Sequence, residues 1–388
     1  MTGAVAPDSA ATAPPTAPQE RGWRWFILAL LMMVTVTAAP EWPPALALLG
    51  GTVRLLLPVE QFALLVLVAV AVCAVVGWWA GGRASVALLW IAMAWWVVWK
   101  LPLPVSGYGA FLRGWSLSLG ASFGLVSLTT RSRPFLGRAL AATALAATVT
   151  VAGLATRTGS DSGIFDDASR MLGSEYQRRV QQSLDTWHDR TESSAWQTFA
   201  QRMPAAAARA DKLAATLGTL GDPGAPGASG SLTARGPLFL LAPALLGLES
   251  LLALGLGWAA YHRLSRVRLG PPLGALRDLR FNDQLVWGLV VGATVLLLPT
   301  LVEWRAVGAN LVCFFGTLYA LRGAGVLTWW IPDRVAALVP LALVILVPIL
   351  GPMIVLAFAL VTTFALGLGD TWRDFRAGAT TRRSGSLR

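Results

Sequence analysis

Long apolar runs separated by short polar or basic segments dominate the chain. Two of the clearest runs cover residues 62–82 and 238–261, and together they hold a single charged residue. A bilayer has a hydrocarbon core about 30 Å thick, and an α-helix needs about 20 apolar residues to cross it. These runs therefore predict transmembrane helices.

The whole pattern predicts an all-α, polytopic transmembrane helix bundle of about ten spans. A nine-span alternative treats 335–369 as one helix, but the turn signal at Gly351-Pro352 favours two helices there. The expected spans cover residues 25–40, 60–80, 84–104, 108–129, 136–156, 237–260, 285–303, 307–329, 335–350 and 352–369.

The segment 41–58 is apolar but too short and too broken by proline and glycine to span comfortably. We interpret it as a re-entrant or interfacial helix, whose backbone needs surrounding protein. The expected organisation is a disordered tail (1–22), an N-terminal membrane bundle of five spans plus the re-entrant segment (23–156), a helical loop and linker (157–236), a C-terminal membrane bundle of five spans (237–369) and a basic tail (370–388).

Composition supports lipid as the surroundings of the chain. The residues are 55% hydrophobic and 13% charged, whereas a soluble domain is about 25% charged. The formal net charge is +11, but the basic residues lie between apolar runs instead of gathering in one folded domain. The lipid bilayer is the expected partner, and a nucleic acid is not.

The distribution of basic residues predicts the orientation. The segments 131–138, 263–283 and 370–388 are rich in arginine, so they are expected in the cytoplasm. An even number of predicted spans separates each from the next, which places both termini in the cytoplasm of a bacterial inner membrane. The loop 157–236 holds nine basic and nine acidic residues. Because it is neutral, we expect it outside.

The same loop carries apolar residues at helical spacing over 165–187, and a second helix is expected over 194–218. A helical hairpin of this size buries little core alone. We expect it to pack on the membrane bundle, on a second copy or on a partner. A loosely ordered loop is an equally good interpretation.

Ionisable residues inside spans are the leading candidates for a site, because burying them is costly. Glu249 falls near the middle of its expected span, and it is either a ligand- or proton-binding carboxylate or a protonated side chain bonded to a neighbouring helix. Arg322 lies about two turns from a cytoplasmic end, where snorkelling is the alternative. Asn310 is a candidate for capping its helix or bonding across helices.

A third set of candidates, Arg54, Lys100 and Arg113, is expected near the outer face. These side chains would suit an outward-opening pocket for an anionic ligand. Neutralisation at the membrane interface by Glu41, Glu60 and Glu303 is the favoured interpretation, since interfacial basic residues are common.

The segment 120–124 matches GxSxG around Ser122, but neither histidine, His188 or His262, is expected at the same depth. A hydrolase would need a base there, so we interpret Gly120 and Gly124 as helix-packing residues. No nucleotide, metal or cofactor motif occurs in the sequence, so neither enzymatic activity nor a cofactor is expected.

The C-terminal third resembles the YybS-like family of bacterial multi-pass membrane proteins of unknown function. The resemblance lies in segments 276–292, 310–327 and 366–376, and the family's terminal motif matches Gly367, Asp370, Asp374 and Arg376. YybS-like proteins are distantly similar to the substrate-binding components of energy-coupling-factor transporters. The resemblance thus implies a helical bundle that binds a ligand on its outer side and borrows an external ATPase.

Two functions follow as expectations. The first is a transport-related component that binds a small ligand through Glu249 together with Arg322 or the outer basic set, and that works with other membrane subunits. The second is a membrane scaffold or assembly factor, which binds protein partners or a second copy through the outer loop and the basic cytoplasmic segments.

Overall fold

The computed structural model describes residues 59–79, 81, 84–100, 107–130, 133–157, 164–221, 237–264, 270–330, 352–373 and 375. Every regular element within these residues is a helix, which confirms the all-α prediction for the described part of the chain. The predicted spans over 25–40 and 335–350 and the predicted re-entrant segment 41–58 lie outside the described residues.

The described helices follow the predicted spans closely in the first half of the chain and less closely in the second. The α-helices are α3 (Val59–Trp79), α4 (Ala84–Lys100), α5 (Gly107–Thr129), α6 (Phe135–Arg157), α7 (Ile164–Thr191), α8 (Ser194–Arg202), α9 (Pro204–Gly221), α10 (Pro237–Leu264), α11 (Val286–Leu297), α12 (Arg305–Trp330) and α15 (Pro352–Trp372). Short 3₁₀ turns, η2 (Leu276–Asp278), η3 (Asp283–Leu285) and η4 (Pro299–Trp304), flank α11 and α12.

Four described helices are long and apolar enough to cross a membrane. Their candidate membrane-spanning stretches are Gln61–Trp79, Phe135–Gly153, Leu241–His262 and Pro299–Trp330. The region 285–303, expected as one span, is divided into η3, the twelve-residue α11 and η4, because Pro299 starts a new turn after Leu298 leaves helical geometry.

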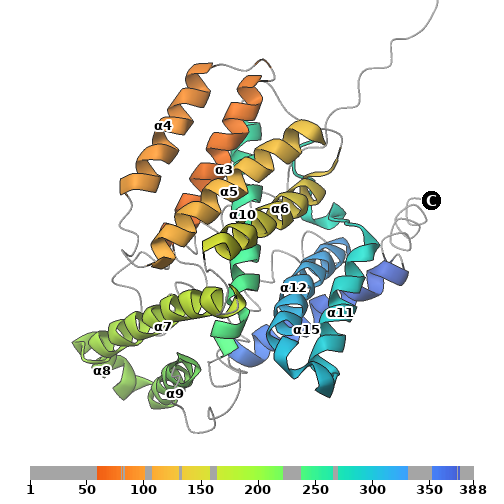
Figure 1. Cartoon of the computed structure of the whole chain (residues 1–388). Helices are drawn as coiled ribbons and strands as arrows, with labels where there is room; N and C mark the ends of the chain where they lie inside the picture. The colour runs from red at the N-terminus through yellow and green to blue at the C-terminus, as the bar shows by residue number, and fades with distance from the viewer. Residues whose placement is uncertain are drawn as a thin grey trace, which may run out of the picture.

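Helix α10 runs through the middle of the molecule, with α3–α6 on one side and α11, α12 and α15 on the other (Figure 1). Its contact with α3 is close: a Cβ placed on Gly257 would lie 2.8 Å from the Cβ of Ala69. Helix α5 packs on α3 in the same way, because a Cβ on Gly120 would lie 2.8 Å from Val68. The two glycines of the GxSxG match, Gly120 and Gly124, therefore serve helix packing, as the sequence indicated.

The outer face of α4 is strongly apolar. Trp95, Trp96 and Trp99 are each more than half exposed, and α4 packs mainly on α3. A continuous apolar face of this kind is unfavourable in water but favourable against lipid chains. The face therefore agrees with a helix at the edge of a membrane bundle.

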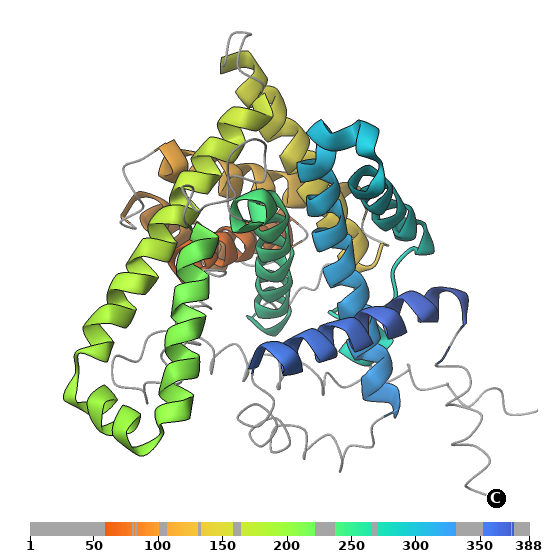
Figure 2. The ribbon, with the colours of Figure 1, turned by 90° about the horizontal axis from the view of Figure 1, so that it is seen from below.

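Helix α15 crosses α12 at a steep angle (Figure 2). The two backbones touch at the crossing: a Cβ on Gly323 would collide with the carbonyl oxygen of Thr363, and one on Gly367 would collide with that of Tyr319. Only glycine permits this approach. Gly367, taken from the family motif, thus sits where α15 meets α12.

The segment between the two halves of the membrane bundle is helical and folds back on itself. Helix α7 passes below α5, α6 and α10 in Figure 1 and contacts all three, while α8 and α9 return along it. Trp187 of α7 and Trp196 of α8 meet at 4.8 Å between ring centroids. The single helix expected over 194–218 is broken at Met203, because a residue before proline avoids the α conformation. The segment therefore packs on the membrane bundle, one of the three surfaces considered for it.

Candidate functional site

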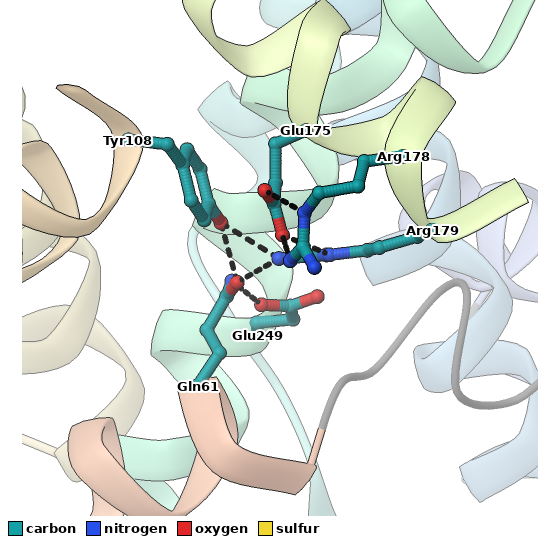
Figure 3. Close-up of polar contacts among 6 residues, drawn as sticks. All are labelled: Gln61, Tyr108, Glu175, Arg178, Arg179 and Glu249. Atoms are coloured by element: carbon teal, nitrogen blue, oxygen red, sulfur yellow. Dashed lines mark hydrogen bonds and ion pairs between the residues drawn. The ribbon is translucent and has the colours of Figure 1, made fainter. Parts of the chain in front are cut away.

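Four helices bring a group of polar side chains together at the end of the bundle that α7 covers (Figure 3). Gln61 lies in the first turn of α3, and Tyr108 lies in the first turn of α5. Arg179 comes from the middle of α7, and Glu249 comes from the middle of α10. Each of the four is at least 90% buried. A hydrogen-bonded cluster therefore lies where the polar helix α7 meets three apolar helices.

The Gln61 amide is the centre of this cluster. Its Nε2 donates a short hydrogen bond to Glu249 Oε2, and its Oε1 accepts one from the Tyr108 hydroxyl. Arg179 Nη2 donates to the same Oε1 at 2.6 Å and to the Tyr108 oxygen at 3.0 Å. The Arg179 guanidinium also lies 5.4 Å from the centre of the Tyr108 ring, within cation–π range.

Glu175, one turn before Arg179, orients the guanidinium from its own helix. Arg179 Nε donates to Glu175 Oε1 at 3.0 Å, and Arg178 Nε donates to Glu175 Oε2 at 2.9 Å. The hydrogen bonds to Glu175 raise the pKa of the Arg178 guanidinium, whose side chain is 45% exposed. Glu175 therefore holds one arginine in the site and one at the surface.

Glu249 has an incomplete set of partners. Its Oε2 accepts from Gln61, while Oε1 is buried and has no hydrogen-bond partner among the described residues. A buried carboxyl oxygen without a partner is costly, whether or not the group is ionised. This oxygen is thus available to a hydrogen-bond donor.

Glu249 lies near the middle of its own helix, as predicted, but beside the first turns of two neighbouring helices. Although it is central in α10, its partner Gln61 stands in the first turn of α3 and Tyr108 in that of α5. The first half of α10 extends beyond these helix ends and packs on α7 and α12. Glu249 consequently lies at one end of the α3–α5 pair, beside α7, and not halfway along it.

Arg322 belongs to a separate cluster. It bonds Asp370 Oδ2 through Nε at 2.9 Å and Asp283 Oδ1 through Nη1 at 2.8 Å, and Nη2 reaches the Asp370 carbonyl at 3.0 Å. The structure therefore joins Arg322 to the motif residue Asp370 and does not bring it to Glu249. Asp374 and Arg376, the other two motif residues, lie outside the described part.

Asn310 links α10 to α12. Its Oδ1 accepts a hydrogen bond from the Ala244 backbone N–H at 2.8 Å, and its Nδ2 donates to the carbonyl of Ala306. Ala244 follows Pro243, which stands inside α10 and disturbs the helical bonding of that turn. A side chain from a neighbouring helix satisfies the displaced donor, as is usual for prolines in membrane helices.

The outer basic set falls largely outside the part of the chain that the structure describes. Arg54 lies outside the described residues, and Lys100 ends α4 with a side chain that is also outside them. Arg113 is half-buried on α5, and its Nε has no hydrogen-bond partner within the described residues. The choice between a pocket for an anionic ligand and neutralisation at the membrane interface, the favoured interpretation, is therefore not tested by the described residues.

Gln61, Tyr108 and Arg179 were not among the site residues predicted from the sequence. A glutamine or tyrosine in the first turn of a span is usually interpreted as an interfacial residue, and an arginine on a polar helix is usually interpreted as a solvated one. A polar residue in the first turn of each of two expected spans, 60–80 and 108–129, was the one available signal. Arg138, counted with a basic loop, is fully buried with its guanidinium 4.5 Å from the centre of the Trp258 ring.

A family model described as "Predicted membrane protein (DUF2232)" matches residues 45–371, well over half of the chain. The chain belongs to the DUF2232 family. No curated protein and no solved structure matches it. The DUF2232 match begins before α3 and reaches the last turn of α15, so it includes both polar clusters and establishes the chain as a membrane protein.

Proposed function

We propose that this DUF2232 protein is a transport-related component of a bacterial inner membrane, which binds a small polar ligand and has no ATPase of its own. One observation carries the proposal. Glu249 keeps an unpartnered oxygen inside a buried polar cluster assembled from four helices. Keeping such a group is costly, and binding a ligand is a reason to keep it.

The position of the cluster suits capture of a ligand from one side of the membrane. Helix α7 is polar and covers the cluster, whereas α3, α5 and α10 are apolar. In the proposed topology of about ten spans, both termini are cytoplasmic and α7–α9 lie outside. The ligand would reach Glu249 from the outer side, as the resemblance to YybS-like and energy-coupling-factor components suggests.

Within this proposal the polar residues of the bundle divide into two roles. Glu249, Gln61 and Tyr108 contact the ligand. Arg322 and Asn310 hold helices together, because their polar atoms are engaged with Asp370 and Ala244. No group in the proposal carries out a chemical reaction, so the proposed activity is binding.

Analysis of the small molecules that co-purify with the protein in mild detergent tests the proposal. Glu249→Gln should lose the bound molecule while remaining folded and monodisperse. Glu303→Gln, which alters an exposed carboxyl of η4, should keep it. If the unaltered protein carries no small molecule, or if both variants retain it equally, the proposal fails.

A scaffold function has its own structural support. Helices α8 and α9 form a small core with α7 around Trp187 and Trp196, and most of their remaining surface is exposed. Deletion of 192–221 removes these two helices and leaves α7 on the bundle. Loss of a co-purifying protein together with retention of the small ligand would favour the scaffold.

A further inference from the structure

The half of the site that belongs to the membrane bundle is a set of acceptors. It consists of the Glu249 carboxyl, the Gln61 carbonyl oxygen and the Tyr108 oxygen with its aromatic face. Among these three groups the carboxyl can carry a negative charge and none carries a positive one. Such a set recognises a planar or compact cation with several N–H donors.

In the structure this role is filled from within the chain. The Arg179 guanidinium bonds the Gln61 and Tyr108 oxygens and lies near the Tyr108 ring, and it reaches them from α7 (Figure 3). Glu175 pairs with Arg179 through α7 itself at 3.0 Å, so the arginine keeps a counter-charge if α7 moves away. The membrane-bundle half of the site, in contrast, would then hold the Glu249 carboxyl without a positive charge from α7.

We infer that the ligand of this site is a small organic cation bearing a guanidinium or primary ammonium group, and that Arg179 occupies the site as a tethered competitor until such a ligand displaces it. The inference rests on the proposed ligand-binding function. The ligand's donors would replace those of Arg179 at Gln61 and Tyr108 and would add a bond to the open Glu249 Oε1. Displacement would release the central part of α7 from the bundle.

A competitor on the same chain lowers apparent affinity by the fraction of time that it vacates the site. Removing the Arg179 guanidinium should therefore tighten binding of a free guanidinium compound. Glu249 supplies the charge, so its neutralisation should abolish that binding. An anion would gain nothing from the bundle half and would be repelled by an ionised Glu249.

The test uses the full chain in mild detergent with three probes of similar shape. Butylguanidine is the cation, butylurea is its neutral counterpart, and pentanoate is an anion. Binding is measured by calorimetry, and hydrogen exchange of 164–191 reports the release of α7. Arg179→Met keeps an apolar stem in place of the arginine, and Arg178→Met alters the neighbouring, half-exposed arginine as the control.

We expect butylguanidine to bind the unaltered protein and to speed exchange in α7, while butylurea and pentanoate do neither. Arg179→Met should bind butylguanidine at least tenfold more tightly, Arg178→Met should bind it unchanged, and adding Glu249→Gln to Arg179→Met should remove binding. If Arg179→Met does not fold, the exchange response of the unaltered protein decides alone.

Three results of the binding experiment would overturn the inference. Butylguanidine binding that occurs only in Arg179→Met would show a cavity left by the substitution. Binding that survives Glu249→Gln would show another site, and preference for pentanoate would show an anion site.

A co-purifying neutral or anionic ligand that depends on Glu249 would leave the proposed function standing and contradict the inference that the ligand is a cation. If butylguanidine binds as expected but no small molecule co-purifies, the cation site stands and the proposed function in transport loses its support.

Discussion

Arg179 Nη2 lies 2.6 Å from Gln61 Oε1, although 118 residues separate the two in the chain. This contact fastens α7, a polar helix, to the first turn of an apolar one. A buried hydrogen bond to a charged donor contributes about 1.5–3 kcal/mol. The contact therefore contributes to the attachment of the helical segment to the membrane bundle.

Arg179→Ala should weaken that attachment. Its loss removes the bonds to Gln61 and Tyr108, so the free energy of local opening of α7 should fall by about 2–3 kcal/mol. Hydrogen exchange over 164–191 should then accelerate by about 30- to 140-fold, since 1.4 kcal/mol corresponds to a factor of ten. Arg178→Ala, at a half-exposed neighbour, should change it by no more than about threefold. Equal exchange in the two variants would contradict the docking role.

Gly323→Ala should destabilise the packing of α15 on α12. The added methyl group would collide with the Thr363 carbonyl, which is backbone and cannot rotate away. We expect a loss of about 2 kcal/mol or more in the free energy of unfolding in detergent. Gly316→Ala is the matched control on the same helix, because its Cβ would lie 3.9 Å from the Phe364 ring. If both alanines are tolerated equally, the helices do not cross at Gly323.

Asp370→Ala should be costly because it leaves the buried Arg322 guanidinium without its buried carboxylate partner, while the remaining partner, Asp283, is 61% exposed. Removing one partner of a buried ion pair costs about 3–5 kcal/mol. Asp278→Ala removes a partner of Arg277 at 3.7 Å, where both side chains are more than half exposed, and should cost under about 1 kcal/mol. Thermal unfolding of the two variants side by side measures the difference, and similar values would show that Arg322 does not depend on Asp370.

Asn310→Leu should cost about 1 kcal/mol, because the Ala244 N–H loses its acceptor in an apolar surrounding. The cost should shrink in a Pro243→Ala background, where α10 can bond that N–H within its own helix. A double-mutant cycle of unfolding free energies measures this coupling. Thr317→Val, whose hydroxyl bonds only its own helix at the Cys313 carbonyl, serves as the comparison. Additive effects of the two substitutions would contradict the proposed compensation.

Much of the helix layout could be read from hydrophobic periods alone. The expected spans at 108–129 and 136–156 differ from α5 and α6 by a residue or less at each end. This accuracy has a physical cause, since backbone groups in lipid must be satisfied within the helix itself and long apolar runs therefore have one solution. The region 285–303 escaped the same reasoning because Pro299 interrupts a run whose composition stays apolar.

The candidate site could be predicted only in part. Glu249 was found because a charged residue inside an apolar run is costly in any membrane fold. Its partners could not be found, because Gln61, Tyr108 and Arg179 lie up to 188 residues away and each has an ordinary role when taken alone. Hydrogen bonds between helices depend on their relative depth and rotation, which periodicity does not encode.

The sequence by itself determined that this chain is a bundle of apolar helices with a polar segment between two halves, since burial cost depends on composition. Only the tertiary structure decided that α7 docks on the bundle, that Arg322 pairs with Asp370, and that Glu249 stands at the end of α3 and α5 with one oxygen open. The physical reason is that packing of side chains from distant helices sets these relations, and each one joins residues whose separation along the chain carries no information about their distance in space.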